Sequence, residues 1–188
     1  MSSINGTPIY CIIGRSGSGK TTLCDELQKN FGWKTVESIT TRLPRSLEEK
    51  GHLFVTQEQF DAKRSKLVAY TKFDNYEYGV TAKMLDEADL YVIDPAGFLY
   101  LKEHYDKRPL RIIYLSLSEE KAIERMKARG DTEEQIAERV QNDRQSFSKE
   151  MLDKLGPMLV LDVSTCGQRE LAACVASYLL WGESSFED

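Results

Sequence analysis

The sequence lacks the features of a membrane or secreted protein. No apolar run approaches the roughly 20 residues that a membrane-spanning helix needs. The start of the chain, residues 1–6, has neither the basic end nor the long apolar stretch of a secretory signal. The four cysteines show no paired spacing of the kind that holds a metal, and no internal repeat is present. We therefore expect a reduced, cytoplasmic setting and no membrane partner.

An excess of basic residues is also missing. Lysine and arginine total 25 against 30 acidic residues, so the formal net charge is −5. This balance argues against broad nucleic-acid binding, although a local basic cluster can still hold phosphates. The 188 residues, 41% of them hydrophobic, suit one domain with a sizeable core.

A glycine-rich turn dominates what is present. Residues 14–21 read Gly-Arg-Ser-Gly-Ser-Gly-Lys-Thr and match G-x-x-x-x-G-K-[ST], after a short apolar strand and before a helix. Glycines there let main-chain N–H groups point at a phosphate, while the lysine adds charge and the threonine hydroxyl can hold Mg²⁺. The motif predicts ATP binding by Gly14, Arg15, Ser16, Gly17, Ser18, Gly19, Lys20, Thr21 and Thr22.

The rest of the chain alternates strands with helices. Beyond the first strand, apolar runs predict strands at 35–40, 90–94, 111–117 and 158–163. Helices between them imply a parallel sheet, of about five strands, covered on both faces. Residues 42–81 break this rhythm: small strands are expected at 53–55 and 67–73, the second ending in an aromatic turn at 75–79. The predicted fold class is therefore α/β with an insert of small strands.

Three further features can serve phosphate chemistry. Arg42 and Arg45 flank a proline in a turn, and Arg125 and Arg129 share one helix face. Each pair, taken alone, is typical of a solvated surface. Asp94 ends a buried strand, where ligands of open α/β sheets collect and where an acid can hold Mg²⁺; the alternative is a helix cap before a proline.

Taken together, these segments resemble the ordered signature of guanylate kinases over roughly three quarters of the chain. The matching residues are 14–22, Ser-Ile-Thr-Thr-Arg-Leu-Pro-Arg at 38–45, Glu-Glu-Lys-Gly at 48–51, Tyr-Gly at 78–79, Asp94 with Gly97, and Arg-Met-Lys-Ala-Arg-Gly at 125–130. The resemblance implies a P-loop kinase core (8–41, 82–128 and 145–181), an insert that binds a nucleoside monophosphate (about 42–81) and a helical lid (about 129–144).

The resemblance also implies roles for single residues. Ser38, Arg42, Arg45, Glu48, Tyr78 and Asp94 would bind the acceptor, and the first arginine pair with Tyr78 would grip its phosphate. Thr21 and Asp94 would hold Mg²⁺, which enters with ATP. Lys20, Arg125, Arg129 and Arg139 would be catalytic, because phosphoryl transfer needs alignment and charge neutralisation rather than a general base. ATP and a small phosphorylated acceptor are the expected partners; the sequence is silent on oligomeric state.

The sequence departs from the family where guanine is read. Ala69 stands in place of the glutamate that reads the guanine edge, and Val80 replaces a hydroxyl. The stretch after Gly51 is two residues short, so the family's phosphate-binding tyrosine is missing and His52 stands nearest. Lys72, Asp74 and Asn75 are polar neighbours that could read a different base. GMP or dGMP is the expected acceptor.

Two alternatives remain open. Ribose 1,5-bisphosphate phosphokinases share the fold and also lack the guanine glutamate, but they usually lack the arginine found here at Arg45. A catalytically silent interaction module of the guanylate-kinase type would typically have lost the loop glycines or the lysine, and Gly19, Lys20 and Thr21 are intact.

Overall fold

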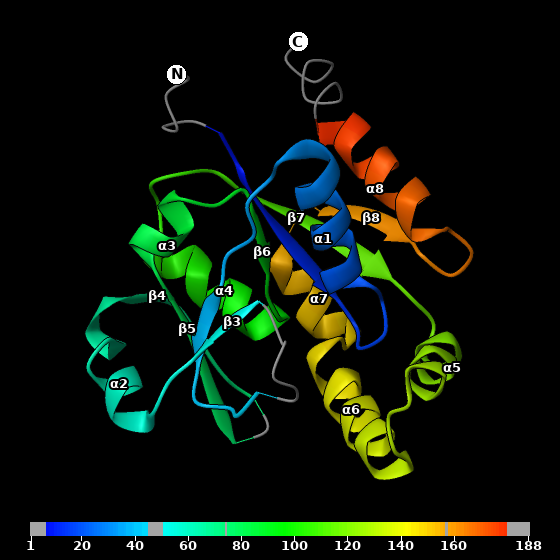
Figure 1. The fold of residues 1–188 in the computed structure, drawn as a ribbon, viewed down its shortest axis with the longest axis horizontal. Helices are drawn as coiled ribbons and strands as arrows, with labels where there is room; N and C mark the ends of the chain where they lie inside the picture. The colour runs from blue at the N-terminus through cyan, green and yellow to red at the C-terminus, as the bar shows by residue number, and fades with distance from the viewer. Residues whose placement is uncertain (1–6, 45–50, 74, 157, 180–188) are drawn as a thin grey trace.

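The centre of the molecule is a four-stranded parallel sheet in the order β6-β1-β7-β8 (Figure 1). Its strands are β1 (Ile9–Gly14), β6 (Leu90–Val92), β7 (Leu110–Ser116) and β8 (Met158–Asp162). The structure is a computed structural model that describes residues 7–44, 51–73, 75–156 and 158–179. All of β1 is buried, as expected for a strand with two parallel neighbours in a sheet covered on both faces.

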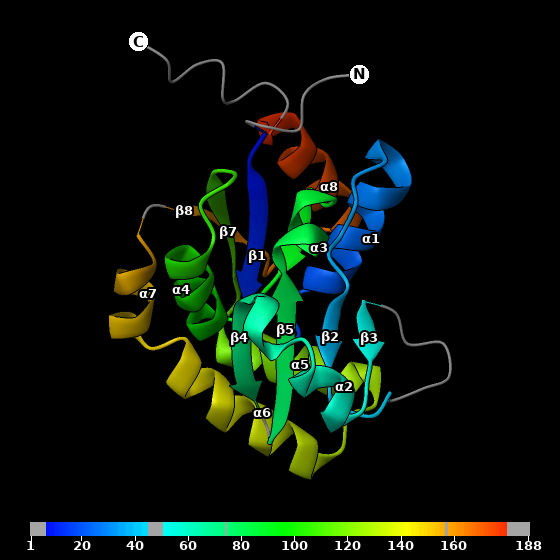
Figure 2. The ribbon, with the colours of Figure 1, turned by 90° about the vertical axis from the view of Figure 1, so that its left-hand side faces the viewer.

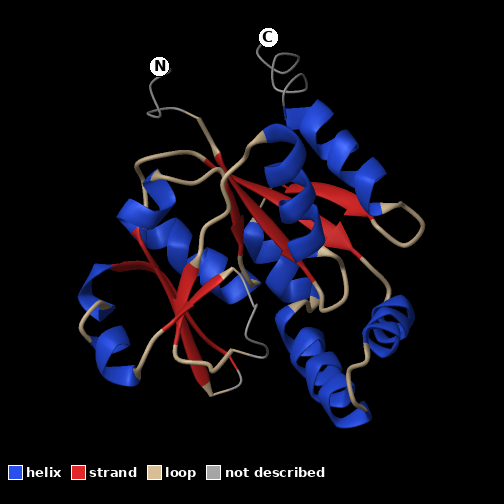
Figure 3. Cartoon of the chain, in the orientation of Figure 1, coloured by secondary structure: helices blue, strands red, loops and turns tan. Residues whose placement is uncertain are grey.

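Helices pack on both faces of this sheet (Figure 3). On one face, α1 (Lys20–Phe31) and α8 (Gln168–Ser177) bury apolar side chains that include Leu27 and Val175. On the other, α3 (Ala82–Asp86), α4 (Pro95–His104) and α7 (Lys149–Leu155) do the same. The predicted α/β class is thus confirmed. No helix in the described part of the chain is long and apolar enough to cross a membrane.

Two further helices project from the carboxyl end of β7 (Figure 1). Helix α5 (Glu119–Arg129) begins at the Ser118 cap and ends at Gly130, which adopts a φ of 92°. Helix α6 (Glu133–Ser146) begins with a capping box at Thr132. Residues 133–155 form two helices rather than one, because the Ser148 hydroxyl caps α7 and starts it afresh after α6.

A second four-stranded sheet, in the order β3-β2-β5-β4, stands beside the first (Figure 2). It contains β2 (Ser38–Thr40), β3 (His52–Phe54), β4 (Leu67–Phe73) and β5 (Tyr76–Thr81), with α2 (Gln57–Asp61) and a 3₁₀ turn (Arg64–Lys66) packed against it. Strand β5 runs antiparallel to β2 and β4. The aromatic turn predicted at 75–79 is therefore wrong: only its beginning turns, with Asn75 at a φ of 61°.

The central sheet has four strands rather than about five because the segment 35–40 leaves it early. Thr35 forms a single parallel bridge to Leu90, beside β6. From Ser38 onward the same segment pairs as β2 with β3 and β5 in the second sheet. This segment thus links the two sheets directly.

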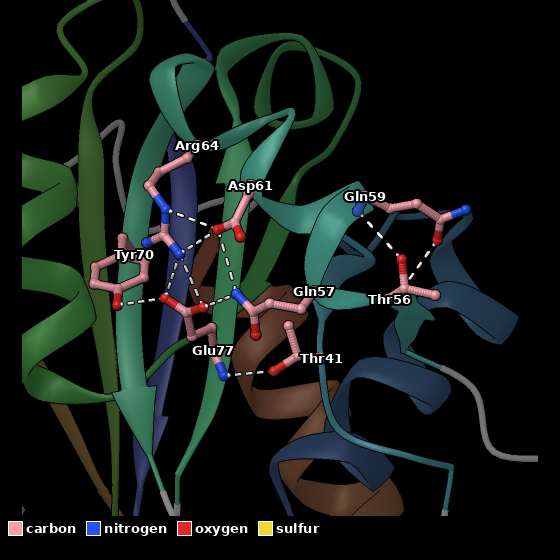
Figure 4. Close-up of polar contacts among 8 residues, drawn as sticks. All are labelled: Thr41, Thr56, Gln57, Gln59, Asp61, Arg64, Tyr70 and Glu77. Atoms are coloured by element: carbon pink, nitrogen blue, oxygen red, sulfur yellow. Dashed lines mark hydrogen bonds and ion pairs between the residues drawn. The ribbon is translucent and has the colours of Figure 1, made fainter.

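A buried carboxylate ties α2 to the outer face of the second sheet (Figure 4). Glu77 of β5 is only 9% exposed. Its oxygens accept hydrogen bonds from Gln57 (2.5 Å), Tyr70 (2.7 Å) and Arg64 (2.9 Å). Burial works to raise the pKa of Glu77, but these three donors outweigh it and lower the pKa below its ordinary value.

Replacing Glu77 with glutamine is expected to destabilise the fold by roughly 1–3 kcal/mol, because the Arg64 charge and the Tyr70 hydroxyl lose their ionised partner. Since the folded-state pKa is lowered, the stabilisation by Glu77 is present above the unfolded pKa and is lost as pH falls through the folded one. Urea unfolding across acidic pH measures this. Glu103→Gln, at an exposed position of α4, is the control; equal stability of the two variants at neutral pH would contradict the prediction.

Candidate active site

The glycine-rich loop joins the end of β1 to the start of α1 and needs its glycines for different reasons. Gly17 and Gly19 adopt φ values of 76° and 88°, in the left-handed region. Gly14 is required for space, because a Cβ there would lie 2.7 Å from the Ser18 hydroxyl oxygen and 2.9 Å from the Leu115 carbonyl oxygen. The loop is thus shaped to expose main-chain amides rather than side chains.

Lys20 folds back over this loop. Its Nζ donates to the carbonyl oxygens of Gly14 (2.5 Å) and Arg15 (3.0 Å). Burial lowers the pKa of the Lys20 amine to about 8; the negative charge of Asp143 opposes this shift, and the positive charges of Arg139 and Arg129 add to it. The lysine is therefore held at the loop by neutral acceptors. A phosphate could replace these carbonyl oxygens as the acceptor of its hydrogen bonds.

The three arginines predicted to be catalytic behave in two ways. Arg129 and Arg139 converge on Asp131: Arg129 Nε lies 3.1 Å from its Oδ1, and Arg139 Nε lies 3.7 Å from its Oδ2. Arg125 instead donates to the backbone carbonyls of Gly17 (3.3 Å) and Val163 (2.5 Å). Arg125 therefore braces the loop in this structure, and its contact with a transferred group stays a prediction.

One face of the second sheet gathers the predicted acceptor-binding groups. Strand pairing places Ser38 opposite His52, and Tyr78 opposite both Thr40 and Thr71, so these side chains share a face. The Ser38 hydroxyl lies 2.8 Å from His52 Nδ1, and the His52 ring meets the Tyr78 ring edge-on at 5.6 Å. The face is polar and aromatic, which suits a phosphorylated ligand with a ring.

Arg42 follows β2 at the edge of this face. It is 8% exposed, its Nη1 donates to the Leu43 carbonyl at 2.8 Å, and its guanidinium lies 5.4 Å from the Phe54 ring centroid. Arg45 and Glu48, the other acceptor ligands predicted in this region, lie outside the described residues.

The groups predicted to bind the donor and the acceptor meet in one pocket of about 190 Å³. Its lining combines Lys20 and other loop residues with Asp94, Tyr78 and, from α6, Asp143. A larger groove of about 800 Å³, between α1 and the second sheet, adjoins it; Ser38 and His52 line both cavities. An elongated ligand could thus place one end beside the loop and the other in the groove.

Asp94 is a helix cap that also lies at the pocket, and its role as a Mg²⁺ ligand stays a prediction. Its side chain caps α4, accepting from the Gly97 N–H at 2.9 Å, and it also lines the pocket, 3.5 Å from the Thr71 hydroxyl. Burial raises the pKa of Asp94, because it disfavours the ionised carboxylate. A nearby cation would stabilise that ionised form. Thr21 sits exposed on the first turn of α1. A hydroxyl and a carboxylate are hard oxygen donors of the kind that suit Mg²⁺.

The two positions that depart from the guanine-reading pattern are sealed in the core. Ala69 and Val80 are paired across β4 and β5 and are 1% and 0% exposed. Strand alternation places Lys72 on the opposite face, with Glu77, and therefore away from the acceptor face. Asp74 lies outside the described residues. Thr71, two residues after Ala69, supplies a hydroxyl on the acceptor face that the motif comparison did not single out.

Two acidic residues near the loop also escaped sequence reasoning. Asp143 accepts a hydrogen bond from the Ser16 N–H at 2.8 Å, and Asp131 pairs with the lid arginines. No sequence pattern indicates that Asp143 lies at the loop, because its partner Ser16 is 127 residues away in the chain. Asp131 could have been noted from its place directly after the Arg-Gly pair.

The chain is similar to several known proteins. Residues 11–146 match the family model described as an AAA domain. The guanylate kinase of Clostridium tetani is 34% identical over 142 residues, covering 70% of this chain and 68% of the relative. That of Geobacter metallireducens is 31% identical, covering 70% of each chain. The crystal structure of guanylate kinase from Anaplasma phagocytophilum superposes with a TM-score of 0.63, at 20% identity, over 97% of this chain and 88% of its own; this shows likeness of fold.

Proposed function

The chain belongs to the guanylate kinase family, and we propose that it moves the γ-phosphoryl group of ATP to a nucleoside monophosphate, with GMP or dGMP as the preferred acceptor. The products would be ADP and the nucleoside diphosphate. The observation that carries this proposal is the shared pocket, in which the phosphate-binding loop and the acceptor face of the second sheet lie against the same space. The relatives named as guanylate kinases support the choice of base.

The division of labour follows from the geometry. The loop amides and Lys20 would hold the ATP phosphates, while Arg42 and Tyr78 would hold the acceptor phosphate, whose oxygen is the nucleophile. Thr21 and Asp94 would hold the Mg²⁺ that accompanies ATP, an ion that neutralises phosphate charge. Alignment of two anions in a closed space supplies most of the catalysis in such reactions.

Three parts of the chain would move relative to one another. In this proposal the core (8–41, 82–128 and 145–181) holds ATP, the insert (about 42–81) holds the acceptor, and the lid (about 129–144) brings Arg129 and Arg139 to the transferred group. The pairing of both arginines with Asp131 supports this, because it keeps their charges together until phosphates compete for them. Closure would exclude water from the reacting groups.

An acceptor screen tests the substrate. With Mg²⁺ and ATP, coupled detection of ADP should show the highest kcat/KM on GMP or dGMP, by at least about a hundredfold over other nucleoside monophosphates, because a site that hydrogen-bonds one substrate can reject analogues by up to roughly 10⁴–10⁵. Because Ala69 and Val80 are sealed in the core, this preference must come from other groups, of which Ser38, His52 and Thr71 lie on the right face.

Three other results of the screen would each contradict part of the proposal. Comparable rates on a pyrimidine monophosphate would contradict the preference for guanine while keeping the enzyme class. Turnover only on ribose 1,5-bisphosphate would overturn the nucleotide acceptor, and failure to bind ATP would favour a silent interaction module. The comparisons give neither alternative support. The Lys20→Ala variant serves as the blank for contaminating kinases.

A further inference from the structure

The donor loop already holds an anion that belongs to the chain itself. Asp143, near the end of α6, is 8% exposed, and its Oδ2 accepts from the Ser16 N–H at 2.8 Å. Its Oδ1 lies 3.4 Å from the Ser16 hydroxyl. The loop amides of such a turn are the groups that bind phosphate. A carboxylate oxygen therefore sits where the proposed donor site would receive a phosphate oxygen.

The charges around Asp143 fit this arrangement. Burial raises the pKa of its carboxyl, while the Ser16 hydrogen bonds and the positive charges of Lys20 and Arg15 lower it. Lys20 likewise feels the negative charge of Asp143. The carboxylate thus does for the loop and its lysine what a phosphate would do, and it partly neutralises them when no nucleotide is present.

The same contact fastens the proposed lid to the loop. Asp143 and the lid arginine Arg139 are four residues apart, so both lie on one face of α6. A second and more exposed connection is formed by Arg144, which pairs with Glu119 of α5 at 2.5 Å; Glu119 also lies 3.7 Å from Arg15 of the loop. Only the Asp143 connection uses a loop amide.

We propose that Asp143 is an internal anion that occupies a phosphate position of the donor loop, and that ATP must displace it in order to bind. The inference rests on the proposed donor site. Two acceptors cannot share the Ser16 N–H at full strength, and two anions at this distance repel each other. Binding of ATP would therefore release the end of α6, and with it Arg139, from the position that it holds in the free enzyme.

Binding measurements on Asp143→Asn test the proposal. The asparagine oxygen can still accept from Ser16, but the negative charge is gone. Calorimetry with inorganic triphosphate, which lacks base and ribose, and with Mg²⁺–ATP without an acceptor should show binding about tenfold tighter than in the wild type, a difference of about 1.4 kcal/mol. Asp143→Ala should bind both ligands at least as tightly, because it also removes the acceptor from the Ser16 N–H.

A matched control separates this effect from a general loosening of α6. Arg144→Ala removes the neighbouring connection to Glu119 and leaves the loop amide in place, so its affinity for triphosphate should stay within about twofold of the wild type. Hydrogen exchange adds a direct readout: the Ser16 amide should exchange faster in nucleotide-free Asp143→Ala than in the free wild type.

Unchanged or weaker binding of both ligands by Asp143→Asn would overturn the proposal. Unchanged binding would mean that the carboxylate does not compete with phosphate, and weaker binding would mean that it supports the loop or helps to hold a cation. If Asp143→Ala does not fold, as thermal unfolding would reveal, the asparagine variant alone decides. None of these measurements involves the acceptor, so a failure here is distinct from a wrong assignment of the nucleoside monophosphate.

Discussion

Replacing Lys20 with alanine is expected to lower turnover by about a thousandfold or more, the scale seen when a preorganised charge on a transferred group is removed. The lysine is already placed on the loop, with its Nζ against the carbonyls of Gly14 and Arg15. Phosphates would replace these neutral acceptors with charged ones. The alanine variant has no positive charge to stabilise the phosphoryl group as it passes from donor to acceptor.

Steady-state kinetics with ATP and the best acceptor from the screen measure the effect. Lys29→Ala, an exposed lysine in the last turn of α1, is the matched control and should keep turnover within about twofold of the wild type. Survival of Lys20→Ala within about tenfold of the wild type would remove Lys20 from the donor site.

The fold should survive this substitution. In the structure Lys20 is half-buried, and its charge does not stabilise the fold. Because the folded pKa is about 8, below the ordinary value of 10.5, the charged lysine opposes folding at neutral pH. Wild-type stability relative to Lys20→Met should therefore rise between about pH 8 and pH 10.5, where the unfolded chain still binds the proton. A pH-independent difference in urea unfolding would contradict this.

The donor half of the site could be predicted because its information is local. Nine consecutive residues, 14–22, carry the loop, and the flanking apolar run and amphipathic helix place it at the carboxyl end of a strand. The starts of α5 and α6 are also local features, because the Ser118 and Thr132 hydroxyls cap these helices within one turn. Such features depend on neighbours in sequence, which a sequence displays.

The acceptor half depended on pairing that no local pattern reveals. Residues 75–79 looked like a turn because of Asn75 and Gly79, but Gly79 lies within β5, where a Cβ would come within 2.7 Å of the Leu67 side chain. Glu77 is buried, because Gln57, Tyr70 and Arg64 converge on it from other elements, and no local pattern in the sequence shows this. The segment 35–40 is predicted to pair in the central sheet, but only Thr35 does so, and Ser38–Thr40 pair with β3 and β5 instead.

Substituting Arg42 with alanine is expected to lower kcat/KM for the acceptor by about a hundredfold, through both a higher KM and a lower kcat, with ATP affinity nearly unchanged. The guanidinium is held over the Phe54 ring and against the Leu43 carbonyl, on the edge of the face that bears Tyr78. A phosphate would draw it from this carbonyl to a bidentate contact, which a lysine cannot reproduce. Arg42→Lys should therefore recover only part of the loss.

Arg64 provides the matched control: it lies in the 3₁₀ turn packed against the same small sheet and pairs with Glu77 on the opposite face. Arg64→Ala should lower the stability of the protein and leave the acceptor KM within about twofold of the wild type. Arg42→Ala should instead raise the acceptor KM and change the stability less than Arg64→Ala does. Calorimetry with ATP completes the comparison. If Arg42→Ala weakens ATP binding as much as acceptor binding, Arg42 belongs to the donor site, and the acceptor phosphate must be held by other groups of the second sheet.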